Sequence, residues 1–223
     1  MVPFRVVILS AVTRNLKGAV LSVIEHEPLI SASEIIVVDD GAREHWDADL
    51  PKVTWVQGAK PFIFARNSNL GFAAAGDADV ILMNDDARLK TQEGFSRLAL
   101  VAQSHPEMGV LSAAIDGFVG NIEQMPKSSS GLRQEKRVLA FVCVYIPRET
   151  YKAVGPLDEQ FVGYGGDDVD YCDRTLRSGR KMGIVDECVV SHGEVPSTYR
   201  SRPDFKALFD QNMELWKKKK GVK

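Results

Sequence analysis

The stretch Ala78-Asp-Val-Ile-Leu-Met-Asn-Asp-Asp-Ala87 is an apolar run that ends in an amide and two carboxylates. Its centre, Val80–Met83, has the length and aliphatic character of a buried β-strand. A second stretch, Ile35-Ile-Val-Val-Asp-Asp-Gly-Ala42, repeats the pattern. Continuous apolar strands are typical of parallel sheets that are covered on both faces. We therefore expect both strands to deliver acidic side chains to the carboxyl edge of an α/β sheet, where ligands bind.

Helical patterns separate these strands along the first two-thirds of the chain. Strands that alternate with helices predict a mainly parallel sheet flanked by helices. The predicted elements are strand Phe4–Ala11, helix Asn15–Glu25, strands Glu34–Val38 and Lys52–Gln57, helix Arg66–Ala75, strand Val80–Met83 and a helix from Thr91 to Ser104.

The last third begins with a region that lacks periodicity, Asp116–Arg137, which is rich in Gly, Ser, Lys and Arg. We interpret this region as a long loop. After it, the pattern predicts strand Val138–Ile146, a helix from Asp167 to Gly179, strands Lys181–Val185 and Val189–Ser191, and a helix from Arg202 that ends in the basic run Lys217–Lys220.

The composition favours a single globular domain of 223 residues, with 44% apolar and 26% charged residues. Its net charge of −2 argues neither for nor against nucleic-acid binding. Three cysteines lie in apolar surroundings without the spacing of a zinc site or disulfide framework, so we expect reduced core residues in a cytoplasmic protein. The apolar run at Met1–Ser10 is too short for a signal peptide, and no run approaches the length of a membrane span.

A third acidic stretch, Phe161-Val-Gly-Tyr-Gly-Gly-Asp-Asp-Val-Asp-Tyr-Cys-Asp-Arg174, places carboxylates behind a glycine-rich turn. Glycines let a backbone approach a ligand closely, and acids in the first turn of a helix are favoured by its dipole. Helix capping accounts for one of Asp167, Asp168 and Asp170. Three acids at this turn favour a functional role.

The clustered acids also suggest a metal ion. Asp85 and Asp86 repel each other at the end of a strand unless solvent or a cation compensates their charge, and a divalent metal with oxygen ligands does so. His192 follows the last predicted strand and suits Mn²⁺. Each of these sites has a simpler alternative. Asp85 and Asp86 could lie in a solvated turn, and His192 could be structural. Asp39 or Asp40 could cap a turn that Gly41 permits.

In their order along the chain, these motifs resemble those of family 2 and related GT-A glycosyltransferases, and the resemblance spans about residues 4–193. It rests on IIVVDDGA (35–42), ARNSNLGFAAAGDADVILMNDDARL (65–89), GYGGDDVDYCDRTLRSGRKMGIV (163–185) and VVSHGE (189–194). The resemblance implies a Rossmann-like GT-A fold with a nucleotide-binding half at about 1–112, an acceptor and catalytic half at about 113–200, and a C-terminal helix and basic tail at about 201–223.

The resemblance also implies roles for individual residues. Asn84-Asp85-Asp86 is similar to the family's Asp-x-Asp motif with Asn replacing the first acid, which leaves Asp86 as the metal ligand, together with His192. Gly165-Gly-Asp-Asp-Val-Asp170 is similar to the Gly-Gly-Glu-Asp segment of galactosyltransferase-like enzymes. That similarity makes Asp168 the catalytic base and places Asp167, Gly166 and Tyr164 at the acceptor.

The nucleotide contacts implied by the resemblance lie near the strand ends. They are Ser10, Ala11, Asp39, Asp40, Arg66, Asn84 and Asp85. The family's usual Pro-x-Tyr-Asn after the first strand is absent, because the chain reads Ser10-Ala-Val-Thr-Arg14 there.

The function implied is inverting transfer of a sugar from a nucleotide-sugar donor, a UDP-sugar in the first instance, to an acceptor hydroxyl with Mn²⁺ or Mg²⁺. The acceptor is left open among glycans, lipid-linked sugars, proteins, small molecules and modified nucleic acids. The basic tail is open to peripheral membrane contact or to simple solvation. Two alternatives are a sugar-1-phosphate nucleotidyltransferase, disfavoured because Ser10–Arg14 contains no glycine, and a non-catalytic nucleotide-binding or receiver domain, which leaves the Gly-Gly-Asp-Asp cluster without a purpose.

Overall fold

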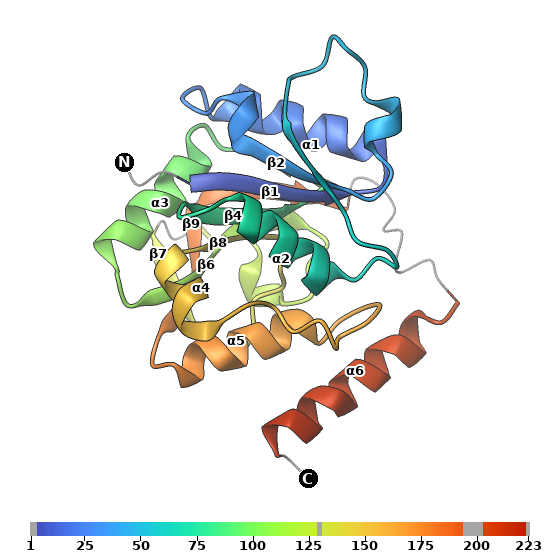
Figure 1. Cartoon of the computed structure of the whole chain (residues 1–223). Helices are drawn as coiled ribbons and strands as arrows, with labels where there is room; N and C mark the ends of the chain where they lie inside the picture. The colour runs from blue at the N-terminus through green and yellow to red at the C-terminus, as the bar shows by residue number, and fades with distance from the viewer. Residues whose placement is uncertain (1–3, 129–130, 194–202, 222–223) are drawn as a thin grey trace.

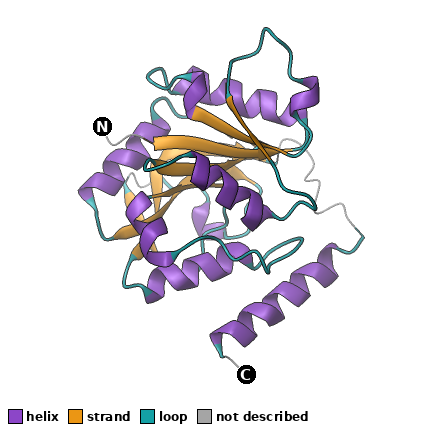
Figure 2. Cartoon of the chain, in the orientation of Figure 1, coloured by secondary structure: helices purple, strands orange, loops and turns teal. Residues whose placement is uncertain are grey.

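The strands form one twisted sheet with helices on both faces (Figures 1 and 2). A computed structural model describes residues 4–128, 131–193 and 203–221. The strands are β1 (Phe4–Ser10), β2 (Ile35–Asp39), β3 (Thr54–Gln57), β4 (Asp79–Asn84), β5 (Ala87–Leu89), β6 (Met108–Gly117), β7 (Leu132–Glu135), β8 (Cys143–Ile146) and β9 (Lys181–His192). Their order is β3-β2-β1-β4-β8-β6-β9-β5, and β7 pairs with β9 outside this path.

The directions of the strands confirm a mainly parallel sheet. β3, β2, β1 and β4 are parallel neighbours, while β8 is antiparallel to both β4 and β6. Because β6 and β9 are parallel, six of the nine strands in the described residues run in one direction. The parallel register places Ser10 beside Asp39 and Leu9 beside Asn84, so the carboxyl ends of β1, β2 and β4 meet at one edge.

The helices are α1 (Thr13–His26), α2 (Phe64–Ala74), α3 (Gly94–Ser104), α4 (Arg148–Val154), α5 (Asp167–Arg177) and α6 (Phe205–Lys220). Alternate residues of β1 enter two apolar cores. Val6 and Ile8 pack with side chains of α1 and α3, whereas Val7 and Leu9 pack with those of α2 and α5. This alternation is the period-2 geometry of a strand that is buried on both faces. The three cysteines are free and buried in these cores.

Several predicted boundaries were wrong. The predicted strand at 138–146 forms only at Cys143–Ile146, and the two strands predicted at 181–191 are one strand, β9, with a register shift. The predicted loop at 116–137 contains a 3-10 turn, η3 (Ile122–Gln124), and strand β7, although Ser129 and Ser130 lie outside the described residues. β7 carries little apolar signal because three of its four residues, Arg133–Glu135, are polar or charged. It pairs antiparallel with β9, and the Arg133 guanidinium adds two hydrogen bonds of 2.7 Å to Asp186 of β9.

Two elements were missed, and one predicted cap was wrong. β5 and the short helix α4 were not expected, because neither is long enough to show a period. The Thr91 hydroxyl accepts a hydrogen bond from the Val189 N–H and does not cap α3, which begins at Gly94. Within the described ranges, no helix has the length and apolar character that crossing a bilayer requires.

Candidate active site

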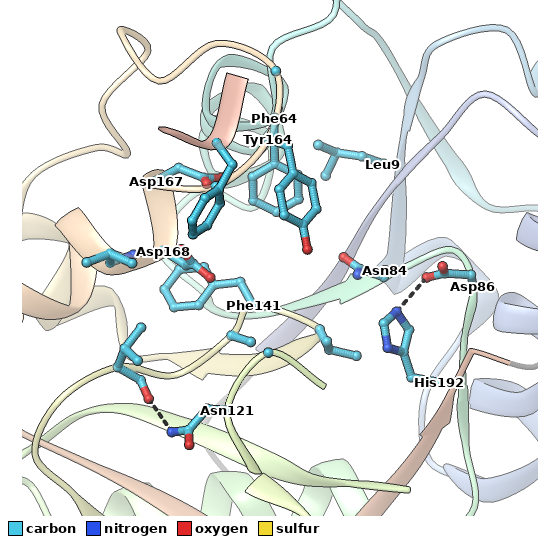
Figure 3. Close-up of a pocket in the computed structure, with 18 of the residues that line it drawn as sticks. Leu9, Phe64, Asn84, Asp86, Asn121, Phe141, Tyr164, Asp167, Asp168 and His192 are labelled. Atoms are coloured by element: carbon cyan, nitrogen blue, oxygen red, sulfur yellow. Dashed lines mark hydrogen bonds and ion pairs between the residues drawn. The ribbon is translucent and has the colours of Figure 1, made fainter. Parts of the chain in front are cut away.

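A cavity of about 410 Å³ opens beside the carboxyl ends of β1 and β4 (Figure 3). Its walls come from these strand ends, the segment before β8, the glycine-rich turn with the start of α5, and α6. The structure therefore brings together residues from motifs that are far apart in the sequence. Those of the predicted site residues that line the cavity are Asn84, Asp85, Asp86, Tyr164, Asp167, Asp168 and His192.

Asp86 and His192 meet on one side of this cavity (Figure 3). Their side chains approach within 3.2 Å, measured from Asp86 Oδ1 to His192 Nε2. The contact depends on β5, which follows Asp86 directly and pairs antiparallel with β9, so that Ala87 lies opposite His192. The His192 side chain is only 8% exposed, and its Nδ1 is hydrogen-bonded to the backbone oxygen of Phe118.

This geometry fits a divalent cation. Because a carbonyl oxygen only accepts, His192 Nδ1 must carry a proton, and Nε2 then either donates a second proton to the Asp86 carboxylate or directs a lone pair at it. Two electron-rich atoms at 3.2 Å require a proton or a cation to link them. An imidazole whose other nitrogen is fixed by a backbone carbonyl is the usual arrangement of a histidine metal ligand. Among the described residues, no group of three or more His, Cys, Asp or Glu side chains forms a ready-made metal site.

Asp85 precedes Asp86 in the chain, and its carboxylate is hydrogen-bonded to a residue of β1. Ser10 Oγ donates a hydrogen bond of 2.5 Å to Asp85 Oδ2. Burial raises the pKa of Asp85 to about 6, and the neighbouring Asp86 carboxylate contributes to the rise, whereas the Ser10 hydrogen bond opposes it. The Ser10 hydroxyl, predicted to contact the nucleotide, is thus engaged with Asp85.

The glycine-rich turn forms the opposite side of the cavity. Gly163, Gly165 and Gly166 have φ values of +89°, +77° and +93°, in the region that side chains with a Cβ rarely adopt. The turn delivers Asp167 and Asp168 to the first turn of α5. Both carboxylates line the cavity, and Figure 3 shows them across from Asp86.

Burial is the main cause of the raised pKa values of these two carboxyl groups. It raises the pKa of Asp168 to about 7, with the neighbouring Asp167 carboxylate as the next contribution. Burial likewise raises the pKa of Asp167 to about 6. A hydrogen bond of 2.8 Å from the Val169 N–H to Asp168 Oδ1 opposes the shift without cancelling it. A carboxylate with a pKa near 7 is a stronger base than an ordinary aspartate.

The other acids of this helix have structural partners. Asp170 is buried and accepts a hydrogen bond of 2.7 Å from Arg174 Nε, one helical turn away. Asp173 forms ion pairs with Arg177 and with Lys220 of α6. Asp170 therefore stabilises α5, and the two remaining acids, Asp167 and Asp168, face the cavity.

Several predicted nucleotide-binding residues lie outside the described cavity lining. Asp39 Oδ1 accepts hydrogen bonds from the N–H groups of Gly41 and Arg43, at 2.9 and 3.0 Å, which is the turn-capping alternative. Asp40 forms an ion pair with Lys60. Further predicted nucleotide-binding residues beyond the lining are Ser10, Ala11 and Arg66, which pairs with Glu159 at 2.9 Å. Gly166, predicted to lie at the acceptor, is also absent from the lining and is the N-cap residue of α5.

Among the lining residues that the sequence did not reveal as site residues are Asn121, Phe64, Phe141, Phe209 and Met213. Asn121 lies in the segment predicted to be a loop. Its side chain donates hydrogen bonds to Glu135 Oε2, at 3.1 Å, and to the Val138 oxygen, at 2.7 Å. Phe209 and Met213 lie on α6, where their spacing predicted a helix but not the surface that it covers.

Comparisons with known proteins give a fold more clearly than a family. No protein-family model matches the chain. An uncharacterized protein of Sinorhizobium fredii, y4gI, is 24% identical over 218 residues, an alignment that covers 83% of this chain and 24% of that protein. The chain thus spans a minor part of the length of this curated relative.

Three solved structures are similar over most of the chain. GalNAc-T7 with UDP, GalNAc and Mn²⁺ has a TM-score of 0.74 at 16% identity, covering 97% of this chain and 48% of that one. The mannosyltransferase PcManGT of Pyrobaculum calidifontis, in complex with GDP-Man and Mn²⁺, has a TM-score of 0.66 at 15% identity, covering 89% and 59%. Staphylococcus aureus TarS has a TM-score of 0.60 at 15% identity, covering 85% and 60%. The chain has the GT-A fold, and it spans less than two-thirds of each of these longer chains.

Proposed function

We propose that this chain is a metal-dependent glycosyltransferase that moves a sugar from a nucleotide-sugar donor, a UDP-sugar in the first instance, to an acceptor hydroxyl with inversion. The observation that carries this proposal is one cavity with a basic carboxylate, Asp168, on one wall and the Asp86–His192 pair on the other. Inverting displacement requires these two functions on opposite sides of the anomeric carbon.

In this reaction Asp168 accepts the proton of the acceptor hydroxyl while the acceptor oxygen forms its bond to the anomeric carbon. The bond from that carbon to the diphosphate oxygen breaks in the same step. Asp167, Gly166 and Tyr164 would bind the acceptor. Two of these residues, Tyr164 and Asp167, line the cavity. The raised pKa of Asp168 suits a general base that operates near neutral pH.

Asp86 and His192 would hold Mn²⁺ or Mg²⁺, with Asn84 and Asp85 beside them. When bound there, the cation would neutralise charge on the leaving nucleoside diphosphate. We assign Ser10, Ala11, Asp39, Asp40 and Arg66 to the base and ribose, because most of them lie at the carboxyl edge of the parallel strands. This assignment requires a nucleotide to contact the protein beyond the cavity itself.

One assay separates this function from its rivals. The protein is incubated with Mn²⁺ and a panel of UDP- and GDP-sugars, since one similar structure contains UDP and another GDP-Man. Release of free nucleoside diphosphate supports a glycosyltransferase. Release of pyrophosphate from a nucleoside triphosphate and a sugar 1-phosphate would identify a nucleotidyltransferase, and release of neither would leave a binding domain.

A further inference from the structure

The C-terminal helix α6 lies beside the loop that leads into α5 (Figure 1). It is hydrogen-bonded to the glycine-rich turn of this loop, which carries the proposed catalytic base. Asn212, a residue that is only 3% exposed, lies in this contact. Its Nδ2 donates hydrogen bonds to the backbone oxygens of Val162, at 3.0 Å, and Tyr164, at 3.1 Å. One amide group on α6 thus holds both flanks of Gly163.

The contact between the turn and α6 leaves no room for side chains on the glycines. A Cβ at Gly163 would lie 2.8 Å from Leu208, and a Cβ at Gly165 would lie 2.7 Å from Phe209. Both distances are shorter than van der Waals contact. Phe209 also packs on the ring of Tyr164, with a centroid separation of 6.4 Å.

The basic run at the end of α6 continues this attachment. Lys219 forms an ion pair with Asp158, and Lys220 forms one of 2.9 Å with Asp173 of α5. Lys219 also lies over the ring of Phe161, 5.8 Å from its centroid. These two lysines are therefore directed toward the domain, which is a local reason for the basic run that the sequence left open to membrane contact.

Phe209 and Met213 of α6 line the cavity together with Asp167 and Asp168. Besides the carboxylates of Asp167 and Asp168, the lining contains a set of aromatic and aliphatic side chains, and Figure 3 shows Phe64 and Phe141 near these carboxylates. These apolar side chains include Phe62, Phe64, Phe141, Val169, Phe209 and Met213.

We propose that α6 completes an apolar acceptor subsite, and that the acceptor carries an aromatic or alkyl group which this subsite binds. A bare sugar ring placed against these apolar side chains would turn hydroxyl groups toward apolar surface, where they lose hydrogen bonds to water, which is unfavourable. An aryl or alkyl group buries apolar surface against the same wall. This inference rests on the proposed glycosyl transfer, because it assigns the acceptor of that reaction.

The test compares matched acceptors that differ only in their apolar group. Binding of methyl and phenyl glycosides of glucose, galactose and N-acetylglucosamine is measured by calorimetry and saturation-transfer NMR, with UDP and Mn²⁺ present. We expect at least one phenyl glycoside to bind about tenfold more tightly than its methyl partner, because its ring is buried. Equal affinity within every pair, or no binding of any phenyl glycoside, would overturn the proposal.

Variants on α6 locate the subsite. Phe209→Ala and Met213→Ala should each remove most of the phenyl preference, while Phe209→Leu, which keeps an apolar side chain, should retain part of it. Gln211→Ala is the matched control, because Gln211 lies on the same helix but is exposed. Circular dichroism confirms that each variant is folded. Weaker UDP binding by Phe209→Ala would place the wall at the nucleotide and contradict the proposal.

The two proposals fail separately. If the phenyl preference and its loss in the variants are observed but no nucleotide sugar releases its diphosphate, the subsite stands and the glycosyltransferase function falls. If diphosphate is released but methyl and phenyl glycosides bind alike, the function stands and the apolar subsite falls.

Discussion

Asp167 and Asp168 are adjacent carboxylates on one wall of the cavity, so mutagenesis must separate them. We expect Asp168→Asn to reduce sugar transfer by about 10²–10⁴-fold, because the amide keeps the shape of the side chain but cannot accept the acceptor proton. Donor binding should remain close to that of the wild type. Asp167→Asn should mainly weaken binding of the acceptor.

Steady-state transfer kinetics and UDP calorimetry on both variants provide the measurement. A nearly wild-type rate for Asp168→Asn together with an inactive Asp167→Asn would reverse the two roles. Two active variants would remove the Gly-Gly-Asp-Asp turn from the catalytic site.

The raised pKa of Asp168 predicts the acid limb of the pH profile. Because burial raises this pKa to about 7, the carboxyl group is protonated below that pH and cannot act as a base. The transfer rate should therefore rise about tenfold per pH unit below the pKa and level off above it. A profile measured at saturating donor tests this, and a rate that is constant from pH 5 to 8 would contradict a basic role for Asp168.

Asp86→Ala should remove the metal-dependent part of donor binding, since it deletes the charged member of the Asp86–His192 pair. His192→Ala should raise the Mn²⁺ concentration needed for half-maximal UDP binding by about 10–100-fold, because water replaces a positioned imidazole. Calorimetry with UDP, with Mn²⁺ and with a chelator, measures both. Unchanged metal dependence in either variant would show that its side chain is structural.

At the scale of elements, Asn212 joins α6 to the turn that carries the proposed catalytic base. Asn212→Ala removes two hydrogen bonds to backbone oxygens that flank Gly163, each worth about 0.5–1.5 kcal/mol. We expect kcat to fall about tenfold because the turn no longer fixes Asp168, while donor affinity is unchanged. Asn212→Asp should be worse, because its carboxylate would face two carbonyl oxygens.

Gln211→Ala is the matched control for this change, since Gln211 is an exposed amide on the same helix. It should leave kcat and KM unchanged. A merely structural role for Asn212 would lower the melting temperature of the Asn212 variants without changing kcat in the folded protein, and that result would refute a positioning role.

At the scale of the whole molecule, the acidic cavity makes stability depend on pH. Burial raises the pKa values of Asp85 and Asp167 to about 6 and that of Asp168 to about 7. These groups bind more protons in the folded than in the unfolded chain between about pH 4 and pH 7, so stability falls as the pH rises through this window. The melting temperature with a chelator present should be several degrees lower at pH 8 than at pH 5.5.

Asp168→Asn should weaken this pH dependence and stabilise the protein at pH 8 by about 1 kcal/mol, or about 2–4 °C. The estimate is small because the carboxylate faces an open cavity. Thermal unfolding followed by circular dichroism at both pH values is the measurement. A lower melting temperature for the variant at pH 8 would show that the carboxylate stabilises the fold.

The sequence by itself determined the parallel half of the sheet and the identity of most cavity acids. Short apolar runs between turn residues, such as Ile35–Val38 and Val80–Met83, are typical of strands that are covered on both faces, and the acids that follow parallel strands lie at one edge. The same local logic placed Asp167 and Asp168 behind a turn of glycines. These features depend on residues that are close together in the sequence, so the order of apolar, acidic and glycine residues is enough to predict them.

Only the tertiary structure decided which side chains face each other. The pairing of β5 with β9 brings Asp86 to His192. Asp39 and Asp170 accept hydrogen bonds within the protein instead of lining the cavity, and the sequence could not distinguish these two acids from the acids that do line it. Likewise, the periodicity of α6 showed that it has an apolar face but not that this face covers the Gly-rich turn. Such contacts join distant segments, and their geometry is set by the packing of the whole chain, which local hydrophobic patterns do not encode.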